Sequence, residues 1–532
     1  MNMSHRRIQL YDTTLRDGAQ TAGIHFSAED KKRIAHQLAE FGIDWIEGGW
    51  PGASPTDNQF FELMRNRTWS HSRLIAFGST ARPNKSIAKD KGLHALINSG
   101  ADAVCIFGKS WDLHVTTGLG ITLEENLHLV QASIALLKQS MPTVMFDAEH
   151  FFDGYTANPE YAMKVLAAAV AGGADTLILC DTNGGSLPNQ ISTLVKEVVK
   201  KYPSIAIGIH AHNDSEMAVA NSITAVCSGA SHIQGTINGI GERCGNANLI
   251  SVIPILCLKL NIDCGIEQEQ LKQLKLLSSF VNEMANRLPW QHQPFVGQNA
   301  FAHKGGIHVS AIRKESRLYE HIHPTCVGNE QRVLVSNQAG RSNILAKLKQ
   351  LDSDSNIKAD APIIAEFVQR IKDMESKGYA FEGADASFRL LLHKALGQFK
   401  RHFKLVSFRV LDEKRGHFEA PESEATVQVR VNGDLLHTAA LGNGPVNAMD
   451  KALRAALSGV YPNLESMRLT DFKVRVLSTK EATEAAVRVL IESSDGTHKW
   501  STVGVSEDML EATYHALNDA IEYKLLIDQI PA

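Results

Sequence analysis

Short apolar runs alternate with longer amphipathic stretches through the first half of this 532-residue chain. Eight of these runs have the composition of buried strands: residues 7–12, 44–49, 74–79, 103–108, 143–149, 176–182, 206–212 and 232–238. Eight β-α units within about 260 residues predict a closed (β/α)₈ barrel of the TIM type. A doubly wound open sheet is the alternative, but it would need fewer strands and a topological switch point.

Polar side chains gather where these predicted strands end. They are Arg16 and Asp17 after the first run, Glu47 in the second, Glu149 in the fifth, Thr182 at the end of the sixth, and His210 and His212 in the seventh. In a barrel, the carboxyl ends of all strands face one mouth. We therefore expect these groups to converge on a single site.

The stretch I-H-A-H-N-D (209–214) carries two histidines on the same face of a strand, because they are two residues apart. Such a pair also arises by chance in a chain with 22 histidines. Asp17 could reach the same point from across the barrel, and two histidines plus one carboxylate leave open positions for a substrate. This set accepts Mg²⁺, Mn²⁺ or Zn²⁺, and the residue types do not choose among them.

Several other polar residues and one Gly-rich stretch could also have a function at this site. Arg16 is either a surface ion-pair partner or a group that stabilises an oxyanion or grips a carboxylate. Glu47 and Glu149 could support the metal ligands or act as a base, and Thr182 offers a hydroxyl to a substrate carboxylate. The stretch G-I-G-E-R-C-G-N (239–246) lacks the Lys-Ser/Thr ending of a P-loop. It is either a simple turn, a phosphate-binding loop, or a segment that brings Asn246 towards the metal.

The pattern changes after the barrel, and we expect three domains: the barrel in 1–275, a helical linker region in 276–395 and a C-terminal α+β domain in 396–532. The last domain repeats a β-β-α unit. Its first copy has strands at 425–431 and 437–442 and a helix at 447–457, and its second copy has strands at 485–491 and 499–504 and a helix at 509–521. Such a module is either a dimerisation lobe or a regulatory site for a small ligand.

Composition narrows the class of protein. The formal net charge is −4 and no basic stripe is present, so nucleic acid is not the expected partner. No stretch approaches the roughly 20 apolar residues of a membrane span, and no signal peptide is recognisable. The seven cysteines are scattered without a C-x-x-C pair, which is typical of reduced thiols in a cytoplasmic protein.

Three motifs together resemble the signatures of the α-isopropylmalate synthase/homocitrate synthase family. They are Y-D-T-T-L-R-D-G-A-Q (11–20), I-H-A-H-N-D (209–214) and G-I-G-E-R-C-G-N-A-N-L (239–249). The resemblance covers the whole chain and implies a Claisen condensation of acetyl-CoA with an α-keto acid. It implies a divalent metal held by Asp17, His210 and His212, with Asn246 as a further ligand.

The resemblance also implies roles for the other residues. Arg16 would stabilise the alkoxide, Glu149 would bind substrate and assist a base that stays unidentified, and Thr182 would hold the keto-acid carboxylate. His308, in G-G-I-H, and Tyr319 would enter the site from the linker of a partner subunit. The active unit would then be a homodimer.

Within the family, two stretches favour pyruvate as the keto acid. I-E-G-G-W-P-G-A-S-P-T-D (46–57) and F-D-A-E-H-F-F-D-G-Y (146–155) are similar to the pyruvate-using members. Trp50 and the Phe151–Phe152 pair would narrow the pocket around a methyl group. The C-terminal repeat would bind an end product, for which isoleucine is the expectation, although a leucine-sensing domain would look the same.

Three other functions compete with this interpretation. The same chemistry with 2-oxoisovalerate is the first, and Trp50 and residues 149–155 argue against it. A lyase that cleaves an acyl-CoA is the second, but a regulatory repeat is expected on a committed biosynthetic enzyme. A catalytically inactive amino-acid sensor is the third, and the intact set of Arg16, Asp17, His210 and His212 argues against that.

Overall fold

The computed structural model describes residues 7–312, 314–333, 362–414, 417, 420–477 and 486–528. The chain divides into two compact units. One consists of Met1–Phe301 and His321–Gln331, and the other of Ala302–Glu320 and Arg332–Ala532. No helix in the described ranges is both long enough and apolar enough to cross a membrane.

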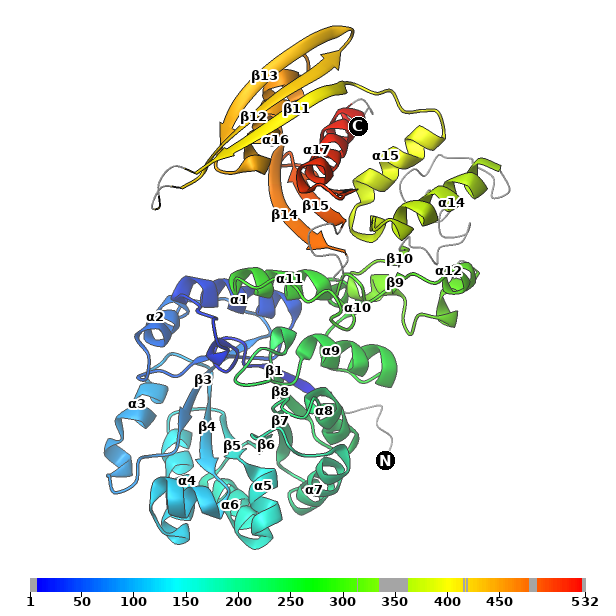
Figure 1. Ribbon diagram of the computed structural model, residues 1–532. Helices are drawn as coiled ribbons and strands as arrows, with labels where there is room; N and C mark the ends of the chain where they lie inside the picture. The colour runs from blue at the N-terminus through cyan, green and yellow to red at the C-terminus, as the bar shows by residue number, and fades with distance from the viewer. Residues whose placement is uncertain are drawn as a thin grey trace. The chain divides into compact units, whose positions relative to one another are not determined.

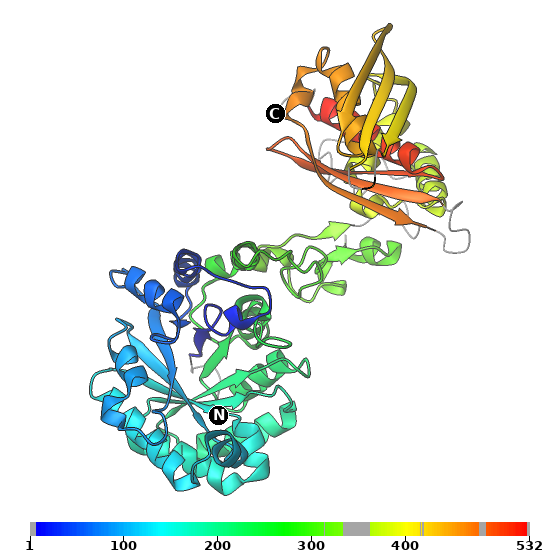
Figure 2. The ribbon, with the colours of Figure 1, turned by 60° about the vertical axis from the view of Figure 1, so that its left-hand side comes forward.

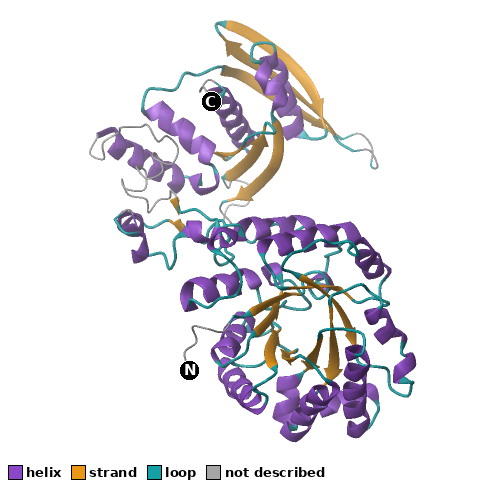
Figure 3. Ribbon diagram, turned by 180° about the vertical axis from the view of Figure 1, so that it is seen from behind, coloured by secondary structure: helices purple, strands orange, loops and turns teal. Residues whose placement is uncertain are grey.

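The first unit contains a closed barrel of eight parallel strands, in which β8 pairs back onto β1 (Figures 1 and 3). The strands are β1 (Gln9–Asp12), β2 (Trp45–Gly49), β3 (Arg73–Ser79), β4 (Ala103–Lys109), β5 (Val144–Glu149), β6 (Thr176–Asp181), β7 (Ala206–Ala211) and β8 (His232–Gly235). Each coincides with one of the eight apolar runs of the sequence. The predicted (β/α)₈ barrel is therefore confirmed, and the open sheet is excluded.

Helices surround the strands. They are α1 (Ala28–Phe41), α2 (Pro55–Leu63), α3 (Lys91–Ile97), α4 (Leu123–Lys138), α5 (Phe151–Ala157), α6 (Pro159–Gly172), α7 (Pro188–Lys201), α8 (Ala218–Cys227) and α9 (Leu249–Pro254). Their ends follow local sequence signals. Helix α1 begins with a capping box between Ser27 and Asp30, and it ends at Gly42, whose φ of 102° favours glycine.

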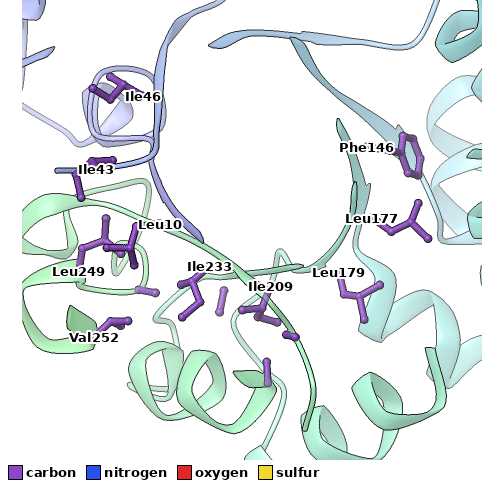
Figure 4. Close-up of a cluster of buried hydrophobic side chains, with 14 of the residues drawn as sticks. Leu10, Ile43, Ile46, Phe146, Leu177, Leu179, Ile209, Ile233, Leu249 and Val252 are labelled. Atoms are coloured by element: carbon purple, nitrogen blue, oxygen red, sulfur yellow. The ribbon is translucent and has the colours of Figure 1, made fainter. Parts of the chain in front are cut away.

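Alternation along each strand separates two layers of side chains. Outward residues such as Leu10, Ile46 and Phe146 pack between the strands and the helices (Figure 4). Inward residues, among them Tyr11, Ile75, Cys105, Met145 and Ile178, fill the barrel interior. Because successive side chains on a strand point to opposite faces, the same parity decides which polar residues reach the barrel mouth.

Shorter elements follow the barrel. They include two helices, α10 (Gln268–Leu271) and α11 (Leu274–Met284). The second unit begins with β9 (Ala302–His303), α12 (Gly306–Ile312) and β10 (Arg332–Val333), and continues with α14 (Pro362–Ser376) and α15 (Asp385–Ala395). Residues 334–361 of the expected linker region lie outside the described residues.

The C-terminal repeat has one more strand per copy than the sequence analysis expected. The first copy is β11 (Lys404–Glu413), β12 (Glu422–Val431), β13 (Asp434–Gly442) and α16 (Pro445–Ser458). The second is β14 (Arg468–Val476), β15 (Val487–Ser494), β16 (Lys499–Ser506) and α17 (Met509–Ile527). Figure 2 shows the two antiparallel sheets, yellow to orange, with α17 in red.

The extra strands, β11 and β14, are sheet edges that stay largely exposed, and a register shift near the start of each, at Leu405/Ser407 and Leu469/Asp471, breaks the apolar alternation. This is why the pattern at 404–413 and 468–476 was not recognised as strand. The central strands β12 and β15 alternate cleanly, and their buried faces pack on α16 and α17 around Val427, Leu453, Ile491 and Leu517.

Candidate active site at the barrel mouth

Asp17, His210 and His212 meet at the carboxyl ends of β1 and β7. The Oδ2 atom of Asp17 lies 3.4 Å from His210 Nε2 and 4.0 Å from His212 Nε2. The two Nε2 atoms are 3.3 Å apart, and one ligand atom from each residue lies within 4.8 Å of the others. The structure thus brings together the three residues that the sequence analysis chose as metal ligands.

The charge states of these groups suit a cation. Burial lowers the pKa of His212 to about 4, and the neighbouring His210 adds to this lowering. Burial would raise the pKa of Asp17, but Arg16 and the two imidazoles hold it well below its ordinary value. A neutral imidazole and an ionised carboxylate are the forms that bind metals. Asp17 and His212 are therefore in their metal-binding forms. At His210 burial lowers the pKa but Asp17 raises it more, so a cation that binds there would displace a proton.

His210 is oriented by a buried chain of hydrogen bonds. Its Nδ1 atom lies 2.7 Å from Gln234 Oε1, and Gln234 Nε2 donates to Asp147 Oδ1 at 3.0 Å. An amide oxygen can only accept, so His210 Nδ1 carries a proton, which leaves Nε2 as the nitrogen that can bind a metal. This partner fixes the ring with Nε2 turned towards Asp17, as outer partners of metal-binding histidines do.

Arg16 reaches into the same space and is held on three sides. Its Nε atom donates to Glu47 Oε1 at 2.6 Å, and its NH1 group lies 3.5 Å from Asp17 Oδ2. Its guanidinium also stacks over the Phe77 ring, 3.7 Å from the centroid. Glu47 is fully buried and additionally accepts hydrogen bonds from Tyr11 and Thr13. Glu47 therefore positions Arg16.

A cavity of about 220 Å³ opens between these groups. Its lining includes the metal-ligand candidates, Arg16 and three aromatic rings, those of Trp50, Phe77 and Phe107. The other lining residues are Gln20, Asp147, Glu149, Cys180, Thr182 and Glu242. Such a small cavity, lined by both charged groups and aromatic rings, suits a small carboxylate with a short apolar end.

Glu149 and Thr182 line the cavity at the ends of β5 and β6. Glu149 is paired with Lys109 across the adjacent strand β4. The Thr182 hydroxyl oxygen accepts a hydrogen bond from the backbone N–H of His150 at 2.9 Å. That contact fixes the side chain but leaves the hydroxyl hydrogen available to another acceptor.

Asn246 lies beside the metal-ligand candidates. It forms an isolated β-bridge with His212, and its side-chain amide donates to Ile240 O at 3.3 Å. Its Oδ1 atom is buried and has no hydrogen-bond partner within the part of the chain that the structure describes. A buried carbonyl oxygen without a partner is costly, and a cation would satisfy it.

His308 and Tyr319 belong to the second unit, whereas the cavity is lined by the first. Within the second unit the two residues lie together, with stacked rings whose centroids are 4.1 Å apart. Tyr319 is 45% exposed, and His308 is also exposed.

The expectation that Phe151 and Phe152 narrow the pocket is wrong. Both side chains are buried in the layer between strands and helices, and neither belongs to the described residues that line the cavity. The reason is local. His150 has φ 58° and caps α5, so the chain turns sharply after β5 and directs the Phe pair into the core. Trp50 does line the cavity.

The sequence analysis missed four residues that shape the site: Phe77, Phe107, Asp147 and Gln234. All four face the barrel interior, towards the carboxyl ends of their strands. Asp147 stands two residues before Glu149, and Gln234 lies on β8 beside His210. The period-two alternation was a signal that could have found them, had inward parity been assigned strand by strand.

Three family models match successive parts of the chain. They are HMGL-like at residues 7–277, homocitrate synthase post-HMGL domain-like at 295–378, and LeuA allosteric (dimerisation) domain at 382–525. The first covers the barrel and all the cavity residues, and the third covers most of the C-terminal repeat.

Curated relatives match over nearly the full length. An (R)-citramalate synthase of Geobacter sulfurreducens is 53% identical over 97% of both chains, and one of Aquifex aeolicus is 52% identical over 98% of both. A probable 2-isopropylmalate synthase of Methanopyrus kandleri is more distant, at 32% identity over 96% of this chain and 97% of its own. The chain belongs to the HMGL-like family and, within it, groups with the (R)-citramalate synthases.

Proposed function

We propose that this protein condenses acetyl-CoA with pyruvate to give (R)-citramalate and CoA, with the help of a divalent cation. The observation that carries the proposal is the small cavity lined by Asp17, His210 and His212, by Arg16 and by a wall of three aromatic rings, Trp50, Phe77 and Phe107. The full-length identity to (R)-citramalate synthases supports the same reaction.

Asp17, His210 and His212 would hold the cation, and the buried oxygen of Asn246 would add a further ligand. A bound divalent cation polarises a keto oxygen and stabilises negative charge that develops on it. The donor set of nitrogen and oxygen atoms accepts Mg²⁺, Mn²⁺ or Zn²⁺. We propose Mg²⁺ or Mn²⁺ as the working ion.

The surrounding side chains then have distinct tasks. Arg16 stabilises the alkoxide that forms on the former keto carbon, and Thr182 donates its hydroxyl to the pyruvate carboxylate. Glu149 binds substrate and assists removal of a proton from the acetyl methyl group of acetyl-CoA. The enolate attacks the keto carbon, the alkoxide takes up a proton, and water cleaves the thioester to release citramalate and CoA.

The aromatic wall accounts for the choice of keto acid. Trp50 meets Phe77 and Phe107 edge-on, with centroids 6.0 and 5.7 Å apart, and the two Phe rings stack on each other. Rigid rings around 220 Å³ of space leave room for a methyl group more readily than for a branched chain. This supports pyruvate over 2-oxoisovalerate.

The second unit would supply control and assembly. The match to a LeuA allosteric (dimerisation) domain supports a homodimer with a regulatory C-terminal repeat. We propose isoleucine as the amino acid that binds this repeat, in a pathway that leads to isoleucine. His308 and Tyr319, stacked and exposed, would complete the partner's active site, His308 as a catalytic residue and Tyr319 as a substrate contact. All seven cysteines are free, which supports a cytoplasmic location.

The test is release of free CoA from acetyl-CoA, followed with a thiol reagent, with Mg²⁺ or Mn²⁺ present. Pyruvate, 2-oxobutanoate, 2-oxoisovalerate and 2-oxoglutarate are supplied in parallel. We expect the highest kcat/KM with pyruvate, and inhibition by isoleucine. A preference for 2-oxoisovalerate would instead identify a 2-isopropylmalate synthase, and failure to release thiol with any of the four would refute the condensation.

A further inference from the structure

The segment that carries Trp50 is fixed by a buried ion pair outside the cavity. Asp57 lies on α2 and Lys31 on α1, and both are buried, with 9% and 4% of their surface exposed. The Asp57 Oδ2 atom accepts the backbone N–H of Trp50 at 2.9 Å, while its Oδ1 atom is paired with Lys31 Nζ. Lys31 Nζ also donates to the carbonyl of Gly48 at 3.2 Å.

Two glycines allow the end of β2 to pack closely against α2. Gly49 has φ 143°, and a Cβ atom there would lie 2.5 Å from the Asp57 carboxyl carbon. A Cβ atom on Gly48 would lie 2.2 Å from the Phe60 ring. The pairing of β2 with β3 also shifts register between Glu47 and Gly49. The backbone is therefore pressed against the Asp57 carboxylate where β2 ends.

Any displacement of Trp50 would reach the cavity through its neighbours. The Trp50 ring stands at 87° to Phe77 and at 84° to Phe107. Phe77 in turn lies under the Arg16 guanidinium. The position of the Trp50 backbone thus sets the wall against which the apolar end of a keto acid would rest.

We infer that Asp57 is a specificity device: the side-chain oxygen that accepts the Trp50 N–H positions Trp50, which limits the size of the keto acid that the cavity accepts, and Lys31 neutralises the buried carboxylate. Neither Asp57 nor Lys31 lines the cavity, so Asp57 is a positioning residue that acts on the keto acid through Trp50. The inference rests on the proposed condensation with pyruvate.

A purely structural role is the competing explanation, because the pair also joins α1 to α2. Replacing a buried ion pair with apolar residues is often neutral for stability, whereas removing one partner leaves a costly unpaired charge. Two double variants separate the roles. The amide variant, Lys31→Met with Asp57→Asn, removes both charges but keeps an acceptor oxygen for the Trp50 N–H. The apolar variant, Lys31→Met with Asp57→Leu, removes the acceptor as well.

The readout is the ratio of kcat/KM for pyruvate to that for 2-oxobutanoate, which is longer by one methylene. Discrimination of one methylene is worth about 10- to 200-fold. We expect the ratio of the amide variant to stay within about threefold of the wild-type ratio. The ratio of the apolar variant should be about tenfold lower than that of the wild type. Thermal midpoints of both proteins show whether the two variants are equally folded.

Trp50→Leu in an otherwise unchanged chain provides an independent check. It should lower the same ratio, and adding it to the apolar variant should lower the ratio no further, since the two changes act through one element. An unaltered ratio in either Trp50→Leu or the apolar variant overturns the inference. Equal loss in the amide and apolar variants would assign the pair a structural role. A wild-type protein inactive with pyruvate would refute the proposed function instead.

Discussion

The two ends of the barrel use acidic residues in opposite ways. At the end where strands begin, Asp44, Asp102 and Asp175 each stand one residue before an even-numbered strand. Each accepts the backbone N–H of the preceding odd-numbered strand, at Leu10, Leu74 and Val144 respectively. Each also pairs with a basic side chain, Arg7, Arg67 or Lys138. These three carboxylates complete the strand pairing and are separated from one another by the barrel.

At the end where strands finish, the carboxylates converge. Asp17, Asp147 and Glu149 line one cavity, and Glu47 lies directly beneath it, bound to Arg16. Bringing like charges together in a buried space costs free energy. This cost arises at the mouth of the barrel, whereas at the opposite end each carboxylate has its own basic partner. The difference separates residues kept for chemistry from residues kept for folding.

The largest expected effect is at the mouth. Asp17→Asn keeps the shape of the side chain but removes its charge, and the several kcal/mol that a well-held cation supplies correspond to a loss of about a thousandfold or more in kcat/KM. The thermal midpoint should fall only modestly, because Asn loses the favourable interaction of the charge with Arg16 and the two imidazoles but also avoids the cost of burying a carboxylate. Thiol release and a thermal melt measure the two quantities on the same sample.

The same cation dependence is open to a chemical check. Removing divalent ions with a chelator should abolish thiol release by the wild-type protein, and added Mg²⁺ or Mn²⁺ should restore it. Activity that survives chelation and dialysis would contradict the assignment of Asp17, His210 and His212 as ligands.

The opposite end should show the reverse pattern. Asp44→Ala would leave the Leu10 N–H, Arg7 and His71 without their shared acceptor. The side chain of Asp44 is 7% exposed, so we expect a loss of about 3 kcal/mol in the free energy of unfolding, measured by urea titration. The kcat/KM should not change. Asp44→Asn, which keeps an oxygen for Leu10 N–H, is the matched control and should lose less.

The sequence predicted the barrel well because fully buried parallel strands read as continuous apolar runs, and because five of the eight strand ends carried a distinctive polar residue. It also pointed to Asp17, His210 and His212, which the structure brings together. It could not assign the partners of these residues. Whether Gln234 meets His210 depends on strand stagger around the closed barrel, which no local pattern records.

Two misjudgements have physical causes of the same kind. Phe151 and Phe152 followed a strand end and so were expected at the mouth, but the left-handed conformation of His150 turns them into the core. The edge strands β11 and β14 lack a continuous alternation because a register shift near the start of each changes which residues face the core. In both cases tertiary surroundings, rather than local composition, decided the outcome.

A smaller effect tests the buried chain behind His210. Gln234→Leu would leave Asp147 and His210 Nδ1 without their shared partner, and loss of such an outer partner lowers metal affinity by about 10- to 100-fold. Mn²⁺ titration followed by electron paramagnetic resonance measures this without relying on turnover. Asp102→Asn, at the opposite end of the barrel, is the control and should bind Mn²⁺ as the wild type does. Equal affinity in all three proteins would show that Gln234 does not orient the ligand.

The smallest effect sharpens the comparison, because it concerns an acid at the mouth end that faces away from the cavity. Asp12 ends β1, and by alternation from the inward Tyr11 it points outward, where it accepts hydrogen bonds from the Thr14 backbone N–H and hydroxyl. The Thr14 hydroxyl oxygen in turn accepts the backbone N–H of Ile237. Burial raises the pKa of Asp12 to about 7, although the bonds from Thr14 offset part of the rise.

The sign of the resulting pH dependence follows from linkage. Between its ordinary pKa and about 7, Asp12 keeps a proton in the folded chain that it has released in the unfolded chain. Its contribution to stability therefore falls as pH rises through this window. The free energy of unfolding of the wild type minus that of Asp12→Asn should drop by about 1 kcal/mol from pH 5 to pH 6, while kcat/KM at neutral pH is unchanged. If the difference in unfolding free energy between the wild type and Asp12→Asn does not change with pH, Asp12 is ionised in the folded chain. The inward or outward direction of a side chain on its strand would then not distinguish acids that stabilise the fold from acids that line the cavity.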